Sequence, residues 1–203
     1  MLRITDAADK SLAATPLAGL AQPADLAVRI EEAPLAGMIT LKGDLEHPTL
    51  RAVVAEATGL EVPGIRKASL GEEGAVLWMA PDELLLIGPY DSAPDAAARL
   101  DADLAEAGPR LVEVVSDARA RFRLIGSGAR EVLAKGAPID LHPSVFGVGD
   151  LRRTRLSHVA VGFWQTAAAP ETFELVCFRS YARYAWEWLT ASAEPGALPG
   201  VLE

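Results

Sequence analysis

Two short stretches decide how this chain is organised: ITLKG at residues 39–43 and FRLIG at residues 122–126. Each mixes apolar and polar residues as a strand does and ends in glycine, and each precedes a segment with helical periodicity and its own stop signal, Gly59 or Gly136. Outward from these stretches, the same order of elements occurs twice along the chain. The repeated order carries more weight than the five matched letters.

Alternating residues and short apolar runs predict strands, and capping and stop residues predict helices between them. Pro48 stands at the favoured first position of one helix, and Ser127 is the expected cap of another. In the first half we expect strands near 26–32, 37–42, 62–69, 75–80 and 84–88, with helices at 47–58 and 94–107. In the second half we expect strands near 111–115, 119–125, 151–157, 159–164 and 172–178, with helices at 127–135 and 180–190.

This layout predicts an α+β fold of two pseudo-equivalent, internally duplicated halves, each ordered strand-strand-helix-strand-strand-strand-helix, with mixed sheets covered by helices. We place the first half at residues 26–109 and the second half at residues 110–192. An extended arm rich in proline and alanine is expected at residues 1–25, and a C-terminal tail at residues 193–203.

Composition narrows the class of protein. Half of the 203 residues are apolar, which indicates a globular chain with a sizeable core. The formal net charge of −9 argues against a nucleic-acid binder. Cys177 is the only cysteine, so a reducing compartment is favoured and an intrachain disulfide or a CxxC metal site is excluded. Because no apolar run has the length of a signal peptide or a membrane span, we expect a cytoplasmic protein.

Positive charge gathers in the second half of the chain. Residues 117–187 hold ten Lys or Arg against seven Asp or Glu. Arg119, Arg121 and Arg123 alternate with apolar residues, so a strand here places three guanidinium groups on one face. With Arg152 they form a candidate surface for a carboxylate, a phosphate or an acidic partner. The other interpretation is a solvated strand face that is balanced by the many carboxylates of the chain.

The last expected helix is the strongest interface signal. Apolar residues from Tyr181 to Leu189 cover an arc of roughly 200°, about twice the ordinary core-facing stripe. Tyr181, Tyr184 and Trp186 are therefore candidate partner contacts, and Trp186 is the one most expected to reach a partner. The alternative is a helix wedged between the two halves of this same chain.

Residues that could carry chemistry have plainer structural explanations. Gly126-Ser127-Gly128 lacks the third glycine of a dinucleotide loop, because Glu131 occupies that place. Asp82 and Glu83 could work as an acid and a base, but Pro81 before them favours an ordinary turn. The three histidines lack the spacing of a metal site or a catalytic partner. We therefore expect no catalytic, cofactor-binding or metal-binding residue.

Short motifs occur in a fixed order across roughly residues 75–190. They are VLWMAPDELLLIG at 76–88, SDARARF at 116–122, KGAPIDLHP at 135–143, FELV at 173–176, RSY at 179–181 and WEWL at 186–189. In order and in spacing these segments resemble the gamma subunit of heterotetrameric sarcosine oxidase. Leu84 and Ala137 stand where that family often has an aromatic residue and a cysteine.

The resemblance implies a folate-binding-type fold, related to the aminomethyltransferase of the glycine cleavage system. It also implies a role in an enzyme that oxidises sarcosine to glycine, makes hydrogen peroxide and passes the one-carbon unit to tetrahydrofolate. The partners would be the alpha, beta and delta subunits, which would hold FAD, FMN, NAD, tetrahydrofolate and zinc, while the gamma chain holds none. A shared fold does not by itself carry folate binding.

Two other functions stay open at this point. A stand-alone folate-binding protein of one-carbon transfer is suggested by the fold family together with the carboxylates of Asp82 and Glu83. A small-anion binder is suggested by the arginine row at residues 119–123. Docking of a non-catalytic subunit onto larger flavoprotein subunits is the leading hypothesis.

Overall fold

The elements of the protein follow the predicted order. A computed structural model describes residues 13–20 and 25–202. The first series is β1 (Arg29–Glu32), β2 (Gly37–Lys42), α1 (Pro48–Thr58), β3 (Ala68–Leu70), β4 (Ala75–Ala80), β5 (Glu83–Gly88) and α2 (Ala93–Asp103). The second is β6 (Leu111–Val114), β7 (Arg119–Ile125), α3 (Ala129–Ala134), β8 (Leu151–Leu156), β9 (Val159–Ala168), β10 (Glu171–Phe178) and α4 (Ala182–Ser192), with short 3-10 turns η2 (Ser116–Ala118) before β7 and η3 (Arg179–Tyr181) before α4.

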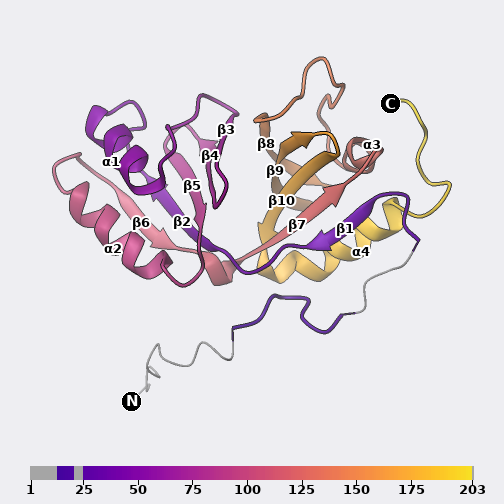
Figure 1. Cartoon of the computed structure of the whole chain (residues 1–203), viewed down its shortest axis with the longest axis horizontal. Helices are drawn as coiled ribbons and strands as arrows, with labels where there is room; N and C mark the ends of the chain where they lie inside the picture. The colour runs from indigo at the N-terminus through magenta and orange to yellow at the C-terminus, as the bar shows by residue number, and fades with distance from the viewer. Residues whose placement is uncertain (1–12, 21–24, 203) are drawn as a thin grey trace.

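Each half sends its first strand to the sheet of the other half. One sheet has the order β1-β7-β10-β9-β8, and the other has the order β3-β4-β5-β2-β6. Arg29 of β1 pairs with Ile125 of β7, while Val114 of β6 pairs with Ile39 of β2. The links 33–36 and 115–118 therefore cross between the sheets, as Figure 1 shows at the base of the molecule. Neither sheet is complete without a strand from the other half.

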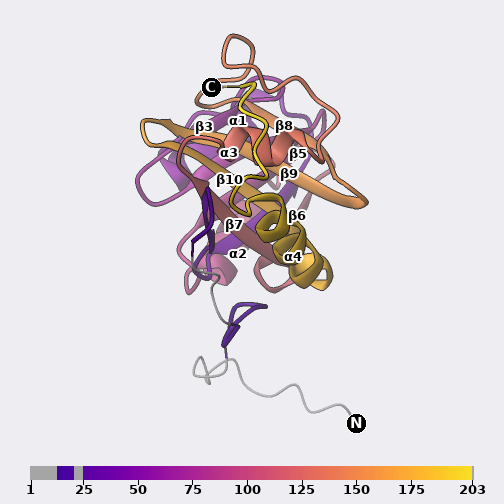
Figure 2. The same ribbon diagram turned by 90° about the vertical axis from the view of Figure 1, so that its right-hand side faces the viewer.

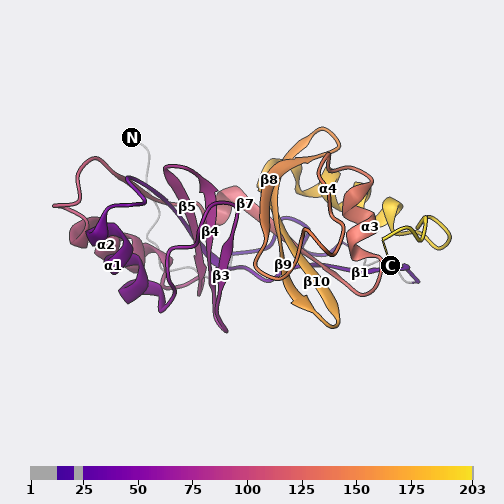
Figure 3. The ribbon, with the colours of Figure 1, turned by 90° about the horizontal axis from the view of Figure 1, so that it is seen from above.

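The layers run helix, sheet, sheet, helix. Figure 3 shows α1 and α2 on one outer face, α3 and α4 on the other, and the two sheets between them. Leu41 and Leu84 are buried between the first sheet and its helices, and Phe122 and Phe173 occupy the same position in the second half. A third cluster, which includes Met38, Leu77 and Trp164, fills the contact between the sheets. The α+β class with helix-covered sheets is confirmed.

Some details of the prediction were wrong. The sheets are antiparallel instead of mixed: every ladder between the named strands is antiparallel, and short turns join neighbours such as β4 and β5 or β9 and β10. Ser127 is not the cap of α3: that position belongs to Gly128, whose φ of 89° is left-handed and whose helix starts without a side-chain cap. The helix predicted at 94–107 ends at Asp103, and the strand predicted at 62–69 shortens to Ala68–Leu70.

Part of the N-terminal arm lies against the second core. Leu17 is buried there, and its backbone N–H donates to Glu32 Oε1 at 3.0 Å. Thr15 Oγ1 donates to the other oxygen of Glu32 at 2.6 Å, and Arg179 Nη2 donates to the carbonyl of Ala14 at 2.7 Å. Residues 1–12 and 21–24 of the expected arm lie outside the described residues.

Arg130 ties the second half together from inside. Its side chain is 3% exposed, and its Nε and Nη2 donate to Glu171 Oε1 at 2.9 and 2.7 Å. Nη1 donates to the carbonyls of Leu141 and Phe146 at 2.6 and 2.9 Å, and Nη2 also donates to Gln165 Oε1 at 3.1 Å. One guanidinium thus joins α3, the loop 135–150, β9 and β10, with all five of its N–H groups paired.

Glu131 fastens the C-terminal tail to α3. Its carboxylate accepts the backbone N–H groups of Gly200 at 2.9 Å and of Leu202 at 2.8 Å, and also that of Val201. Figure 2 shows the tail passing over α3 on its way to the end of the chain. Burial alone would raise the pKa of Glu131, but the three amide donors hold it below the ordinary value of 4.5.

Replacing Arg130 by Met should lower the free energy of unfolding by about 3–5 kcal/mol, because Glu171 and two buried carbonyls lose their donors. Urea denaturation measures the change. Arg99→Met, on the exposed face of α2, is the matched control and should stay within about 0.5 kcal/mol of the parent. An Arg130→Met protein as stable as the control would contradict the bracing role.

The tail should be held in a pH-dependent way. Because the pKa of Glu131 is lower in the folded chain, its stabilising contribution is full above 4.5 and is lost as the pH falls through the folded value. Amide hydrogen exchange at residues 200–202, normalised to the intrinsic rate at each pH, should show protection that fades in acid. Glu131→Gln should weaken this protection at neutral pH, whereas the exposed control Glu106→Gln should not. Unchanged exchange in Glu131→Gln would refute the contact.

Candidate functional site

The arginine row lies on β7, and it faces the space between the two sheets. Ala120, Phe122 and Leu124 point into the helix-covered core, which confirms the predicted alternation. The opposite face of the strand carries Arg121, which is only 9% exposed. The interpretation of a solvated face is therefore wrong for Arg121, because the sheet β3-β4-β5-β2-β6 packs over this side of β7.

Glu174 on β10 forms ion pairs with two arginines of this row. Its Oε2 lies 3.1 Å from Arg121 Nη2, and its Oε1 accepts a hydrogen bond of 3.0 Å from Arg123 Nε. Burial lowers the pKa of Arg121, although Glu174 acts in the opposite direction. Sequence reasoning missed Glu174, but its alternation with the buried Phe173 and Leu175 was a usable signal that it shares the face of the arginines.

Arg119 and Arg152 have contacts of a different kind. The guanidinium of Arg119 lies over the Phe178 ring at 4.1 Å from the centroid, and burial lowers its pKa. Arg152 Nη1 donates to the carbonyl of Leu151 at 2.8 Å, and its guanidinium lies 5.2 Å from the Phe146 ring centroid. The predicted row is thus divided. Arg121 and Arg123 line a cleft between the two sheets, whereas Arg119 lies beside the exposed ring of Phe178.

Trp186 was expected to reach a partner, and this prediction was wrong. It is 3% exposed and its ring lies 6.2 Å from that of Phe122, inside the core of the same chain. The buried stripe of α4 consists of Ala182, Ala185, Trp186 and Leu189. The wide apolar arc seen in the sequence is therefore partly filled by the chain itself.

Three aromatic side chains near the start of α4 remain open. We call Phe178, Tyr181 and Tyr184 the aromatic patch; they are 44%, 47% and 38% exposed. Arg119 stacks on Phe178 at one end, and Tyr184 Oη lies 3.1 Å from Ser157 Oγ at the other. Arg179 lies within the patch, and its buried Nη1 has no hydrogen-bond partner in the described chain. Exposed aromatic residues beside arginine are typical of protein interfaces.

Asp82 and Glu83, the candidate acid and base, lie in different environments. Asp82 lies exposed in the turn between β4 and β5, as the Pro-Asp-Glu interpretation predicted. Glu83 is buried, with its Oε2 at 3.3 Å from Lys42 Nζ and 3.6 Å from Arg153 Nη1. The pair is therefore part of a turn and an ion-pair cluster.

The remaining candidates serve local structure. His47 Nδ1 accepts from the backbone N–H of Thr49 at 3.2 Å at the start of α1, and His142 Nδ1 lies 2.7 Å from Ser144 Oγ in a turn. Burial raises the pKa of the Cys177 thiol to about 12, so it stays protonated at neutral pH. Among residues 13–20 and 25–202, no His, Cys, Asp and Glu side chains gather in a group that could hold a metal ion.

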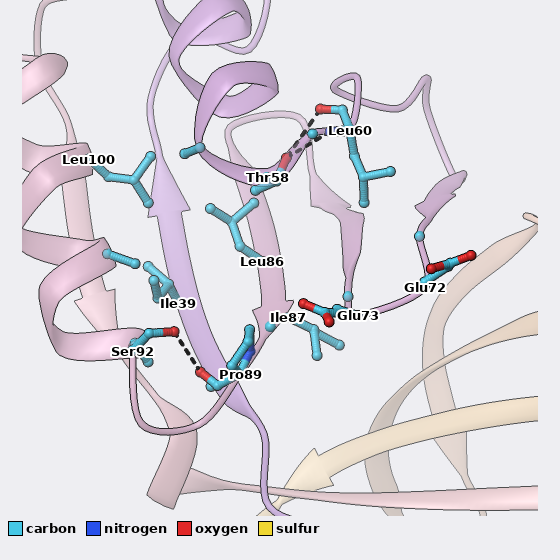
Figure 4. Close-up of a pocket in the computed structure, with 18 residues that line it drawn as sticks. Ile39, Thr58, Leu60, Glu72, Glu73, Leu86, Ile87, Pro89, Ser92 and Leu100 are labelled. Atoms are coloured by element: carbon cyan, nitrogen blue, oxygen red, sulfur yellow. Dashed lines mark hydrogen bonds between the residues drawn. The ribbon is translucent and has the colours of Figure 1, made fainter.

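A pocket of about 410 Å³ lies between α1, α2 and the first sheet. Ile39, Leu86 and Leu100 form apolar walls, as Figure 4 shows. Thr58 and Ser92 direct their hydroxyls to backbone groups of the chain, at 2.7 Å to Val54 O and 3.3 Å to Pro89 O. The pocket is therefore apolar in its lining, apart from carboxylates at the turn 71–74.

Comparison with known proteins identifies the family. Residues 42–194 match the model of the family described as sarcosine oxidase, gamma subunit. A gamma subunit of sarcosine oxidase from Corynebacterium sp. (strain P-1) is 33% identical over 141 residues, which cover 68% of this chain and 66% of that one. The chain thus aligns with slightly less than two thirds of that relative.

Solved structures extend the likeness to the whole fold. A chain of heterotetrameric sarcosine oxidase from Corynebacterium sp. U-96, in complex with pyrrole 2-carboxylate, is 28% identical with a TM-score of 0.80, covering 94% of this chain and 99% of that one. Aminomethyltransferase T of the glycine cleavage system from Bartonella henselae shares the fold, with a TM-score of 0.55 and 16% sequence identity. The match covers 79% of this chain and 44% of that one.

No helix in the described part of the chain combines the length and the apolar character that crossing a membrane requires. The family match covers all four helices, strands β3 to β10, the crossing link 115–118 and the aromatic patch. The resemblance inferred from short motifs is confirmed by this match. The chain belongs to the sarcosine oxidase gamma subunit family.

Proposed function

We propose that this chain is the non-catalytic gamma subunit of a heterotetrameric sarcosine oxidase. The assembly would oxidise sarcosine to glycine, produce hydrogen peroxide and pass the one-carbon unit to tetrahydrofolate. The observation that supports this proposal best is the likeness to a chain of the heterotetrameric enzyme, which extends over 99% of that chain. A cytoplasmic location, compatible with the single buried thiol of Cys177, belongs to the same proposal.

Two buried carboxylates of the chain support a structural role, because each has a task within the fold. Glu83 pairs with Lys42 and Arg153, and Glu131 binds the tail. The proposed partners are the alpha, beta and delta subunits, which would hold FAD, FMN, NAD, tetrahydrofolate and zinc. We expect the isolated chain to have no oxidase activity.

The alternative, a stand-alone folate-binding protein of one-carbon transfer, depended on Asp82 and Glu83. Asp82 is exposed in its turn, and Glu83 is occupied by two cations. The likeness to aminomethyltransferase T concerns the fold and does not carry its ligand. Docking onto larger subunits is therefore the function that the described residues support better.

The aromatic patch is the surface that we propose for docking. Phe178 and Tyr181 offer large apolar areas, and the guanidinium of Arg119 stacked on Phe178 adds a positive charge beside them. Such residues supply most of the binding energy in many interfaces. The patch rests on η3 and α4, which the second core holds in place.

The double variant Phe178→Ser/Tyr181→Ser should weaken assembly by about 2 kcal/mol or more, which is roughly a thirtyfold loss of affinity. Co-expression with the other three subunits, followed by size exclusion, measures how much of this chain elutes with the complex. The matched control is Ile65→Ser/Val145→Ser, two apolar residues that are more exposed, at 72% and 51%, and lie on the loops beside β3 and β8.

The control should assemble as the parent does, and both variants should keep the melting temperature of the isolated chain. If the aromatic double variant elutes fully with the complex, the proposed docking surface is wrong. If a complex of the other subunits forms and turns over sarcosine normally without this chain, the proposed function itself is wrong.

A further inference from the structure

A second pocket, of about 440 Å³, opens between the two sheets at the level of the β3–β4 turn. We call it the inter-sheet cleft. It lies apart from the aromatic patch and shares no residue with it. Its apolar lining is Leu70, Ile87, Ile125 and Trp164, and its charged lining is Arg121, Arg123, Glu174, Glu72 and Glu73.

Arg121 on the wall of this cleft is short of acceptors. Its Nε is buried and has no hydrogen-bond partner, and the one carboxylate that its guanidinium meets in the described chain is Glu174. Arg130 is a useful comparison, since it is similarly buried and all five of its N–H groups are paired. Buried guanidinium groups are normally satisfied, so the unpaired Nε leaves the positive charge of Arg121 incompletely compensated on this wall.

The single carboxylate of Glu174 is also shared. Its two oxygens serve Arg121 and Arg123 separately, at 3.1 and 3.0 Å, so two guanidinium groups face one carboxylate on this wall. The wall therefore carries a local excess of one positive charge. A carboxylate of a ligand would match the planar donors of Arg121 and remove this excess.

The mouth of the cleft has the opposite charge. Glu72 and Glu73 stand on the turn between β3 and β4, and both are exposed. Figure 4 shows Glu72 on the side of the turn toward the strands of the other sheet, whereas Glu73 points toward Ile87. Two carboxylates at the entrance disfavour a phosphate or a dicarboxylate and favour a ligand that also carries a positive group.

We propose that the inter-sheet cleft binds a free amino acid with an apolar side chain. The carboxylate of the ligand lies against Arg121 and Arg123, its ammonium group faces Glu72, and its side chain lies among Leu70, Ile125 and Trp164. The volume of the cleft falls within the range of small-molecule sites, and its mixture of apolar walls with a few charged groups is typical of them. This site is independent of the proposed docking role.

Isothermal titration of the full chain with L-leucine tests the proposal. Three related probes separate its parts: N-acetyl-L-leucine lacks the ammonium charge, L-leucinamide lacks the carboxylate, and inorganic phosphate reports general anion binding. We expect saturable binding of L-leucine, weakened roughly tenfold or more when either charge of the ligand is removed. Tighter binding of phosphate than of L-leucine, or no saturable binding of L-leucine, would overturn the proposal.

Variants of the chain give a second, separate test. Arg121→Gln and Glu72→Gln should each weaken L-leucine binding roughly tenfold. Glu72 is exposed, so its replacement keeps the fold even if loss of Arg121 disturbs the sheet contact. Glu106→Gln, beyond the end of α2, is the matched control and should bind as the parent does. Equal affinity of Glu72→Gln and Glu106→Gln for L-leucine would show that the ammonium group does not meet Glu72.

Discussion

The exchange of first strands is the constraint on which the rest of the structure depends. β1 completes the sheet of the second half along β7, and β6 completes the sheet of the first half along β2. The link 115–118 is bound to the start of β2: Met38 N–H donates to the buried Ser116 Oγ at 2.9 Å, and Val115 N–H donates to Met38 O at 2.8 Å. Since both links are short, the sheets are held face to face, and the inter-sheet cleft and the aromatic patch keep fixed positions on one rigid frame.

Element order was predictable because its signals are local. Alternation fixed Ala75–Ala80 and Arg119–Ile125 to the residue, and Gly59 ends α1 in the left-handed conformation that a stop glycine supplies. Strand exchange was not predictable, because a strand of four residues carries no mark of the sheet that it joins. Gly37, which follows the link 33–36, gives a partial signal in retrospect, because a Cβ there would lie 2.4 Å from Pro89 O.

The candidate site was predicted less completely. Alternation correctly placed Arg119, Arg121 and Arg123 on one face of a strand, but it cannot tell whether water, a second sheet or a partner covers that face. The wrong prediction for Trp186 has the same cause. An apolar arc on a helix indicates that the arc is buried but not by what, and here Trp186 packs against Phe122 of the same chain. Long-range pairings such as that of Glu174 with Arg121 appear only once β7 and β10 lie side by side.

The central claim is that the two halves are one cooperative unit because they share strands. Native-state hydrogen exchange across a urea series tests this directly, by comparing the amides of Leu41 in β2 with those of Phe122 in β7. We predict that both amides report the same free energy of opening and the same dependence on urea. Two distinct opening free energies that persist as urea rises would show that the halves unfold separately, and would contradict the account.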